Sequence, residues 1–219
     1  MLVNDASDEV TPSGTSLAED VYRRLHHDIL NGYLPGGTIV QERRLAAKLG
    51  VSRTPLRDAI GRIEGQGLIV RNARGVLAVR VISLEDYLNC IALRLLTEPS
   101  AAALTSTRIS LEEISRLDGI LARIEAETDP PADVVSDFDD ELHGAIGLNS
   151  GNPFLAQTIA DMRRYTMIFE RQLIPRRGAP GQTDHRAIVA ALQARDPDRA
   201  QAAMAQHLQR VRERVLAHY

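Results

Sequence analysis

The spacing of apolar residues along the chain indicates a protein built mainly from helices. Apolar side chains recur every three or four residues, as at Val21, Leu25 and Ile29, and this spacing places them on one face of a helix. Segments rich in Gly, Pro and Asn separate the periodic stretches. The pattern predicts helices over residues 17–30, 42–49, 53–66, 84–105, 111–127, 133–149, 153–174, 184–195 and 198–217.

Serines at the predicted helix starts support these boundaries. Ser83 with Asp86, and Ser110 with Glu113, have the three-residue spacing of a capping box, in which each partner bonds the other's backbone N–H. Ser52 stands where an N-cap residue is expected for the helix that follows it.

Two short apolar runs interrupt the helical pattern. Residues 68–71 and 76–80 are joined by the turn sequence NARG, which predicts a small β-hairpin. Three helices followed by a hairpin form the outline of a winged helix-turn-helix. We therefore expect a mainly α protein with a flexible arm over residues 1–16, a winged helix-turn-helix domain over 17–80, and an all-α bundle of about six helices over 84–219.

Composition narrows the class of protein. No apolar run in the 219 residues approaches membrane-span length, and the single cysteine, Cys90, fits a reducing cytoplasm. The net charge of −3 hides a segregation: residues 17–80 carry eleven basic and six acidic residues, whereas 81–219 carry fifteen basic and twenty acidic ones. A basic segment in an acidic chain points to an anionic partner for the first domain.

The basic residues of this segment lie where a helix-turn-helix protein would contact DNA. Arg53 and Arg57 are four residues apart and share one face of the predicted helix, with Thr54 beside them. That face can reach base edges or phosphates in a major groove. Ser52 and the first-turn N–H groups can hold a phosphate, and Arg43 flanks the groove. From charge alone, a plain solvated helix face is an equal alternative.

A resemblance favours DNA binding. The segment LPGGTIVQERRLAAKLGVSRTPLRDAIGRIEGQGLI resembles the signature of the GntR family of bacterial transcriptional regulators, over about residues 17–80. By position, the resemblance implies a double-stranded DNA operator as partner. The implied DNA contacts are Arg43, Ser52, Arg53, Thr54, Arg57 and Gly75.

The bundle carries a possible metal-ligand set. Asp139 and His143 are four residues apart on one predicted helix, and His185 and His207 lie on two others. Three imidazoles and a carboxylate suit Zn²⁺, Ni²⁺ or Mn²⁺. Only the first pair has local ligand spacing, and each histidine taken singly also fits a surface or hydrogen-bonded position.

The segments LRLLTEPSAAAL, DFDDELHGAIGLNSGNPFL and DHRAIVAALQARDPDRAQAAMAQHL are similar to the FCD effector domain of the FadR-type branch of that family. The similarity implies that Asp139, His143, His185 and His207 hold one divalent metal ion per chain, at the floor of a pocket for a small organic acid. Arg94 would then be the cation facing the effector, with a salt bridge to Glu98 as the alternative.

Together these features predict a cytoplasmic, homodimeric transcriptional repressor that a small organic acid releases from DNA. The alternative is a metal-dependent enzyme that acts on a small carboxylate, since a site with open metal positions can activate water. No second carboxylate or histidine is clearly placed as a general base, so we do not expect an enzyme.

Overall fold

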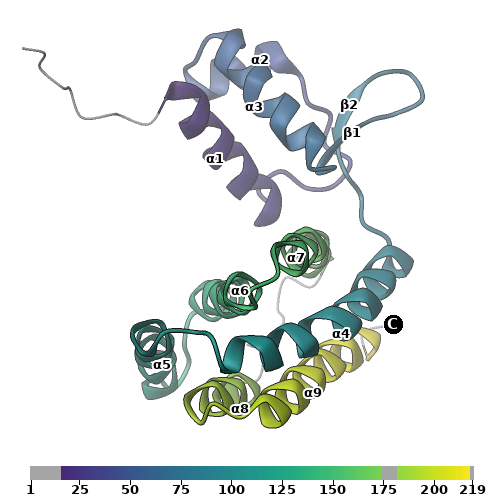
Figure 1. The fold of residues 1–219 in the computed structure, drawn as a ribbon. Coiled ribbons are helices and arrows are strands. Elements are labelled where there is room, and N and C mark those ends of the chain that lie inside the picture. Colours follow the sequence, from purple (N-terminus) through teal and green to yellow (C-terminus); the bar gives the residue numbers. More distant parts are fainter. Residues whose placement is uncertain (1–15, 174–181, 218–219) are drawn as a thin grey trace, which may run out of the picture.

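The computed structural model describes residues 16–173 and 182–217 (Figure 1). The predicted arm therefore lies outside the described residues, except for Ser16, which caps the first helix. The elements are α1 (Leu17–Leu30), α2 (Glu42–Leu49), α3 (Arg53–Gly65), β1 (Ile69–Arg71), β2 (Leu77–Val79), α4 (Leu84–Ser106), α5 (Leu111–Ala126), α6 (Ala132–Asn149), α7 (Pro153–Leu173), α8 (Gln182–Gln193) and α9 (Pro197–Leu216).

The predicted fold class is confirmed: three helices and a small hairpin precede a bundle of helices. The least accurate boundaries are those of α8, which the periodicity placed at residues 184 and 195 and the structure places at 182 and 193. The helix ends at Gln193 because Arg195 adopts a left-handed backbone with φ 56°. The Arg195 guanidinium also donates to the Ser106 and Ile109 carbonyls, which fixes it at the α4–α5 turn.

The capping predictions are confirmed in one case and half correct in another. At the start of α4, the Ser83 hydroxyl accepts from the Asp86 N–H and the Asp86 carboxylate accepts from the Ser83 N–H. At the start of α5, the Ser110 hydroxyl accepts from Glu113 as predicted. The Glu113 carboxylate instead accepts from Arg116, so we find no second half of a box there.

The N-terminal part is a winged helix-turn-helix. Helices α1 and α3 pack across a core formed by residues such as Leu25, Ile29, Leu56 and Ile63, and α2 packs against α3. Strands β1 and β2 pair antiparallel, with Ile69 opposite Val79. This hairpin projects from the end of α3 as the wing (Figure 1).

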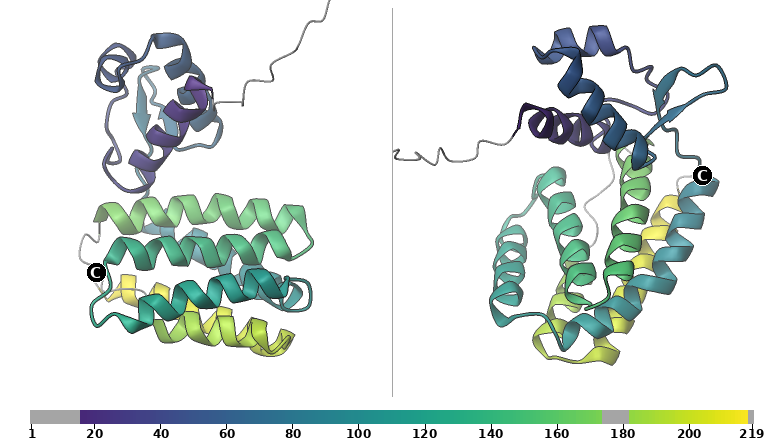
Figure 2. Two further views of the ribbon diagram at one scale, coloured as in Figure 1. Left: turned by 90° about the vertical axis from the view of Figure 1, so that its left-hand side faces the viewer. Right: turned by 45° about the horizontal axis from the view of Figure 1, so that its top comes forward.

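The C-terminal part is a helical bundle organised around α4. This helix packs along α9 and α7 and also contacts α6, while α5 and α8 close the bundle at one side (Figure 2). The core residues between them include Phe138, Leu142, Ile146, Ile188 and Leu208. Within the described residues, no helix is long and apolar enough to cross a membrane.

The two parts meet at α7, which lies directly beneath the winged helix-turn-helix (Figure 2). Ile168 and Phe169 of α7 belong to the same buried cluster as the core of the DNA-binding part. Gly67, with φ +73°, lies so close to Tyr165 that a Cβ atom there would be 2.6 Å from the tyrosine hydroxyl. The two parts therefore share buried apolar contacts along α7.

Candidate functional site

The exposed face of α3 carries polar groups that the protein itself leaves free. Ser52, Arg53, Thr54 and Arg57 are exposed, as is Arg43 on α2. Within the described residues, only Arg57 has an ion-pair partner: its Nε lies 3.8 Å from Oε2 of Glu42, and 72% of its side chain remains exposed. The structure thus leaves all five of these predicted DNA contacts exposed, so that their donors can bind a ligand.

Ser52 occupies the N-cap position of α3, but its side chain forms no cap hydrogen bond, which corrects the capping expectation. The cap serines of α1, α4 and α5 all accept from the N–H of the third helical residue. In α3 that residue is Pro55, which has no N–H. The Ser52 hydroxyl and the first-turn N–H groups are therefore available to an anion.

Gly75 lies at the tip of the wing, where its φ of +74° requires a residue without a Cβ. The Asn72 side chain forms the turn by accepting from the N–H groups of Arg74 and Val76, at 2.9 and 3.0 Å. Arg71 pairs with Glu64 of α3 at 2.8 Å and ties the wing to that helix. The exposed Arg74 thus sits on a defined turn next to α3.

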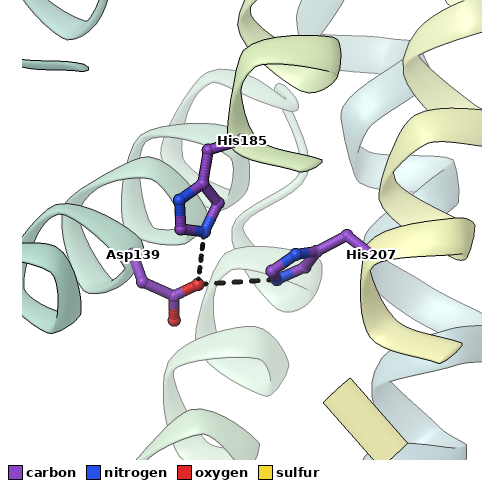
Figure 3. Close-up of side chains that lie close together, drawn as sticks. All are labelled: Asp139, His185 and His207. Atoms are coloured by element: carbon purple, nitrogen blue, oxygen red, sulfur yellow. Dashed lines mark hydrogen bonds and ion pairs between the residues drawn. The ribbon is translucent and has the colours of Figure 1, made fainter. Parts of the chain in front are cut away.

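The four predicted metal ligands come together inside the bundle, although they come from three helices. Asp139 on α6 lies at the centre: its Oδ1 is 2.8 Å from Nε2 of His185 on α8 and 3.4 Å from Nε2 of His207 on α9 (Figure 3). The ligand atoms of these three residues all lie within 4.8 Å of one another. His143 completes the cluster, with Nε2 3.5 Å from Asp139 Oδ1 and 3.2 Å from Nε2 of His207.

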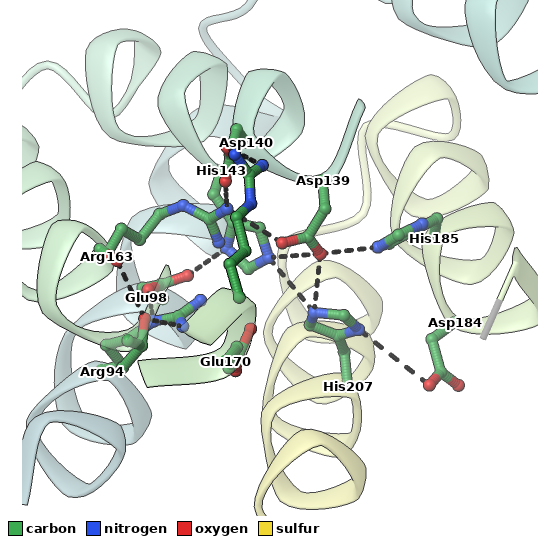
Figure 4. A network of polar contacts seen from close by, with 12 residues as sticks. Arg94, Glu98, Asp139, Asp140, His143, Arg163, Glu170, Asp184, His185 and His207 are labelled. Carbon is green, nitrogen blue, oxygen red and sulfur yellow. Dashed lines mark hydrogen bonds and ion pairs between the residues drawn. The ribbon is translucent and has the colours of Figure 1, made fainter. Parts of the chain in front are cut away.

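A further carboxylate, that of Glu98, orients one of these imidazoles, His143. Glu98 on α4 accepts a hydrogen bond from Nδ1 of the buried His143, which directs Nε2 towards Asp139 (Figure 4). Histidines that bind metals commonly donate their second nitrogen to a carboxylate, as His143 does to Glu98. Nδ1 of His207 lies 4.0 Å from Asp184, beyond hydrogen-bond distance.

The donor set fits a divalent cation. Three imidazole nitrogens lie around one carboxylate oxygen of Asp139. Nε2 of His143 and Nε2 of His207 are 3.2 Å apart, so both can point to one ion. Burial lowers the pKa of His207 to about 3, so this ring is neutral near neutral pH and can offer a lone pair. Imidazole nitrogens and a carboxylate oxygen are the ligand types that Zn²⁺ and related ions prefer.

Arg163 on α7 neutralises the carboxylates beside this cluster. Its guanidinium donates to Asp139 at 2.9 Å and also to Asp140. Burial acts to raise the pKa of Asp139, but Arg163 and His143 outweigh it and hold that pKa well below the usual range. The carboxylate is thus ionised and ready to coordinate. Sequence reasoning missed Arg163, although it shares a helical face with the buried Ile159 and Thr166.

Arg94 forms the salt bridge to Glu98 that was the alternative to an effector role, and it also donates to Thr166 at 3.0 Å. It nevertheless lines a small cavity beside Asp139 and His207, together with Arg163 and Glu170. That cavity has about 10 Å³ of space, which is room for roughly one water molecule. An organic acid would require this cavity to open.

A larger cavity of about 390 Å³, which Arg163 also lines, lies between the two parts of the protein. Its walls come from α1, α6 and α7 and are mostly apolar. Polar groups on its lining are His26, Asp140, His143, Arg163 and Arg164. Since His143 and Arg163 also belong to the cluster described above, the cavity borders the candidate metal site.

Comparison with known proteins identifies both parts of the chain. Residues 17–79 match the model for bacterial regulatory proteins of the gntR family, and residues 90–210 match the model for the FCD domain. The HTH-type transcriptional repressor RspR of Escherichia coli K12 is 29% identical over 90% of this chain and 88% of its own length. The Nta operon transcriptional regulator of Aminobacter aminovorans is 27% identical over 82% of this chain and 85% of its own. These relatives are regulators, in agreement with the expectation that the chain is not an enzyme.

Solved structures share the fold. E. coli McbR/YncC superposes with a TM-score of 0.79 at 20% identity, covering 94% of this chain and all of that one. A putative GntR transcriptional regulator from Rhodococcus sp. RHA1 gives 0.76, also at 20% identity, with the same coverage. At this identity, the likeness describes the arrangement of helices and not the ligand.

Proposed function

The chain belongs to the GntR family of DNA-binding transcriptional regulators and carries an FCD domain, and from this membership we propose that it is a cytoplasmic homodimeric repressor released by a small organic acid. Residues 17–80 would form the operator-binding domain and residues 84–219 the domain for metal and effector. The single observation that carries the DNA-binding assignment is the set of exposed polar groups on α3, of which only Arg57 has an ion-pair partner in the described residues.

In this proposal, Arg53, Thr54 and Arg57 enter the major groove, because α3 is the second helix of the helix-turn-helix. Ser52 and the first-turn N–H groups bind a phosphate. Arg43 contacts the flanking backbone, and the wing around Gly75 approaches the minor groove or the backbone beside it.

Substitution of the two arginines tests this assignment. Arg53→Ala or Arg57→Ala is expected to weaken binding to an operator selected from random duplex DNA by about 1–3 kcal/mol. Arg212→Ala, which removes a charge from the exposed side of α9, serves as the matched control. Fluorescence anisotropy measures the affinities. Unchanged affinity in both α3 variants would rule out the groove assignment.

We further propose that Asp139, His143, His185 and His207 hold one divalent ion, with Zn²⁺, Ni²⁺ and Mn²⁺ as candidates. The ligand atoms of Asp139, His185 and His207 converge, and Nε2 of His143, which Glu98 orients, lies beside them; this arrangement supports the site. When bound, the ion would supply a positive centre for the carboxylate of an effector. Arg94 and Arg163 line the same small cavity and would add positive charge opposite it.

Elemental analysis tests the metal site. The double variant His143→Ala, His207→Ala is expected to purify without metal, whereas the wild type carries close to one ion per chain. His26→Ala with His27→Ala removes two imidazoles outside the cluster and is the matched control. Full metal content in the His143 and His207 double variant would contradict the assignment.

The effector class is tested by thermal shift. A ligand that binds only the folded protein raises its melting temperature. The melting temperature of metal-loaded protein is measured with small carboxylates and sugar acids. The matching alcohols, which lack the acid group, are the control. The proposal predicts that acids shift the melting temperature and that the shift disappears in the double histidine variant. Equal shifts in both proteins would place the effector elsewhere.

A further inference from the structure

A cavity of about 260 Å³ lies within the winged helix-turn-helix part, away from the candidate metal site. Its walls come from α1, from the segment that leads into α2, from α2 itself and from β2. None of the described residues that line it belongs to α3 or to the C-terminal bundle. We call this cavity the α2 pocket. A ligand inside it would contact neither the predicted groove-binding helix nor the metal ligands.

The inner walls of the α2 pocket are apolar. Leu25 and Ile29 of α1 and Val79 of β2 are almost completely buried and form its inner side. Val40 and Leu45 are half-buried and pack against the same core. A concave site with walls of this kind suits the hydrocarbon part of a small molecule.

Two cationic side chains of α2 line the same pocket. Arg44 and Lys48 are exposed and lie four residues apart, so they share one face of the helix. In the part of the chain that the structure describes, neither has an ion-pair partner, and no acidic residue lines the pocket. Like charges at this spacing repel each other. An anion bound between them would relieve the repulsion and accept charge-assisted hydrogen bonds from both.

From these observations we propose that the α2 pocket binds an amphipathic monocarboxylate. The apolar chain lies against Leu25, Val40 and Leu45, and the carboxylate lies between Arg44 and Lys48. The two charges alone would also suit a DNA phosphate or a hydrophilic acid, but neither of these would fill the apolar cavity between them. The site is a second ligand site, separate from the effector pocket proposed in the bundle, because it uses none of the metal ligands.

Calorimetric titration of the full chain with octanoate tests the chemistry of the ligand. Octanoate is expected to bind about tenfold more tightly than hexanoate, because each buried CH₂ group strengthens binding by about fourfold. The matching alcohol, 1-octanol, is expected to bind about fivefold more weakly than octanoate, since it lacks the charge. Absence of octanoate binding, or equal affinities for hexanoate and octanoate, would overturn the proposal.

Removal of the two cations tests the location of the site. The double variant Arg44→Ala, Lys48→Ala is expected to bind octanoate about tenfold more weakly than the wild type. Arg123→Ala with Arg212→Ala, which removes two exposed charges from α5 and α9, is the matched control and is expected to bind octanoate as the wild type does. Octanoate affinity that is unchanged in the Arg44 and Lys48 variant would contradict the site.

Chemical labelling provides a second measurement that needs no variant. Lys48 is the only lysine among the 219 residues, so acetylation of lysine reports on this pocket alone. Saturating octanoate is expected to slow the acetylation of Lys48 by N-hydroxysulfosuccinimide acetate by about fivefold or more. Acetate and 1-octanol at the same concentration are expected not to slow it. Mass spectrometry of the peptide that contains Lys48 measures the rate. Equal rates with octanoate and with acetate would show that the carboxylate does not bind in the α2 pocket.

Discussion

Glu98 is the residue that gives His143 its direction. Its carboxylate accepts from Nδ1 of His143 and is held in place by Arg94, so that Nε2 points to Asp139. Burial acts to raise the pKa of Glu98, but Arg94 and His143 outweigh it and keep that pKa well below the usual range. An ionised, fixed acceptor of this kind raises the basicity of the imidazole that it holds.

We therefore expect Glu98→Gln to weaken metal binding by about 10- to 100-fold, without removing any ligand atom. Competition with a chelator of known affinity measures the change. Glu113→Gln, which alters a carboxylate paired with Arg116 on the surface, is the control. If Glu98→Gln binds metal as tightly as the wild type, Glu98 does not orient a ligand.

His26 makes stability depend on pH at the interface between the two parts. Burial, followed by the charges of Arg164 and His27, lowers its pKa from 6.5 to about 4. Between these values the unfolded chain binds a proton that the folded protein does not, so the free energy of unfolding falls as the pH falls through this window.

His26→Gln should therefore lose less stability than the wild type between pH 7 and pH 4.5. After allowance for its partial exposure, we expect a difference of about 1 kcal/mol, or about 2–4 °C in melting temperature. His27→Gln, with an exposed side chain on the same helix, is the control. Parallel pH profiles of His26→Gln and the wild type would show that His26 is not the group responsible.

The sequence predicts those residues of the candidate metal site that are neighbours on one helix, but not those that depend on how the helices pack. Asp139 and His143 share a helical face, so their proximity follows from local spacing. Glu98 and Arg163 act on the cluster from α4 and α7, and such contacts depend on helix packing. A buried charge on an apolar helix face, as at Arg163, was the available signal.

At the level of helices, the start of α3 differs from the other serine-capped starts. The Ser83 hydroxyl closes the first turn of α4 at 3.0 Å from the Asp86 N–H, whereas Pro55 leaves Ser52 without the equivalent donor. The cap serine therefore stabilises the helix at the start of α4, whereas at the start of α3 its hydroxyl is free to bind a ligand.

This difference predicts opposite results for two similar substitutions. Ser83→Ala should cost about 1 kcal/mol of stability, or about 2–4 °C, because a helix cap is lost. Ser52→Ala should change the melting temperature little but lower operator affinity by about threefold to tenfold, through the loss of a phosphate contact. Thermal melts and anisotropy measure the two effects. A large loss of stability in Ser52→Ala would indicate a cap that the structure does not contain.

The extents of the helices were predictable because apolar periodicity and caps are local features. Predicted and observed boundaries of α1 and α2 coincide, since each ends at a glycine- or asparagine-containing turn. The predicted end of α8 was wrong because Arg195 is held by hydrogen bonds to carbonyl groups at the α4–α5 turn. Such a helix end depends on tertiary contacts, which the spacing of apolar residues cannot predict.

At the level of the whole molecule, α7 connects the candidate metal site to the DNA-binding part. Its Arg163 donates to Asp139 (Figure 4). Its Arg171 donates to Asp140 at 3.1 Å and also to Asn31, the C-cap residue of α1. We propose that opening the small cavity for an effector displaces α7 and, through Arg171, shifts the winged helix-turn-helix. The sequence does not reveal this link because its three helices lie far apart along the chain.

Arg171→Met tests this route. We expect operator affinity without effector to stay within about threefold of the wild type, while the effector-induced change in operator affinity, typically 1–3 kcal/mol in such systems, falls by about half or more. Arg116→Met, which removes a guanidinium paired between α5 and α6, is the control. An undiminished effector response in Arg171→Met would exclude this connection.

The most direct test of the account is the operator affinity of metal-loaded protein with and without the carboxylate that raises its melting temperature most. We predict that this carboxylate raises the dissociation constant for the selected operator by about tenfold or more in the wild type, and leaves it unchanged in His143→Ala, His207→Ala. A carboxylate that stabilises the wild type yet leaves its operator affinity unchanged would contradict a ligand-released repressor.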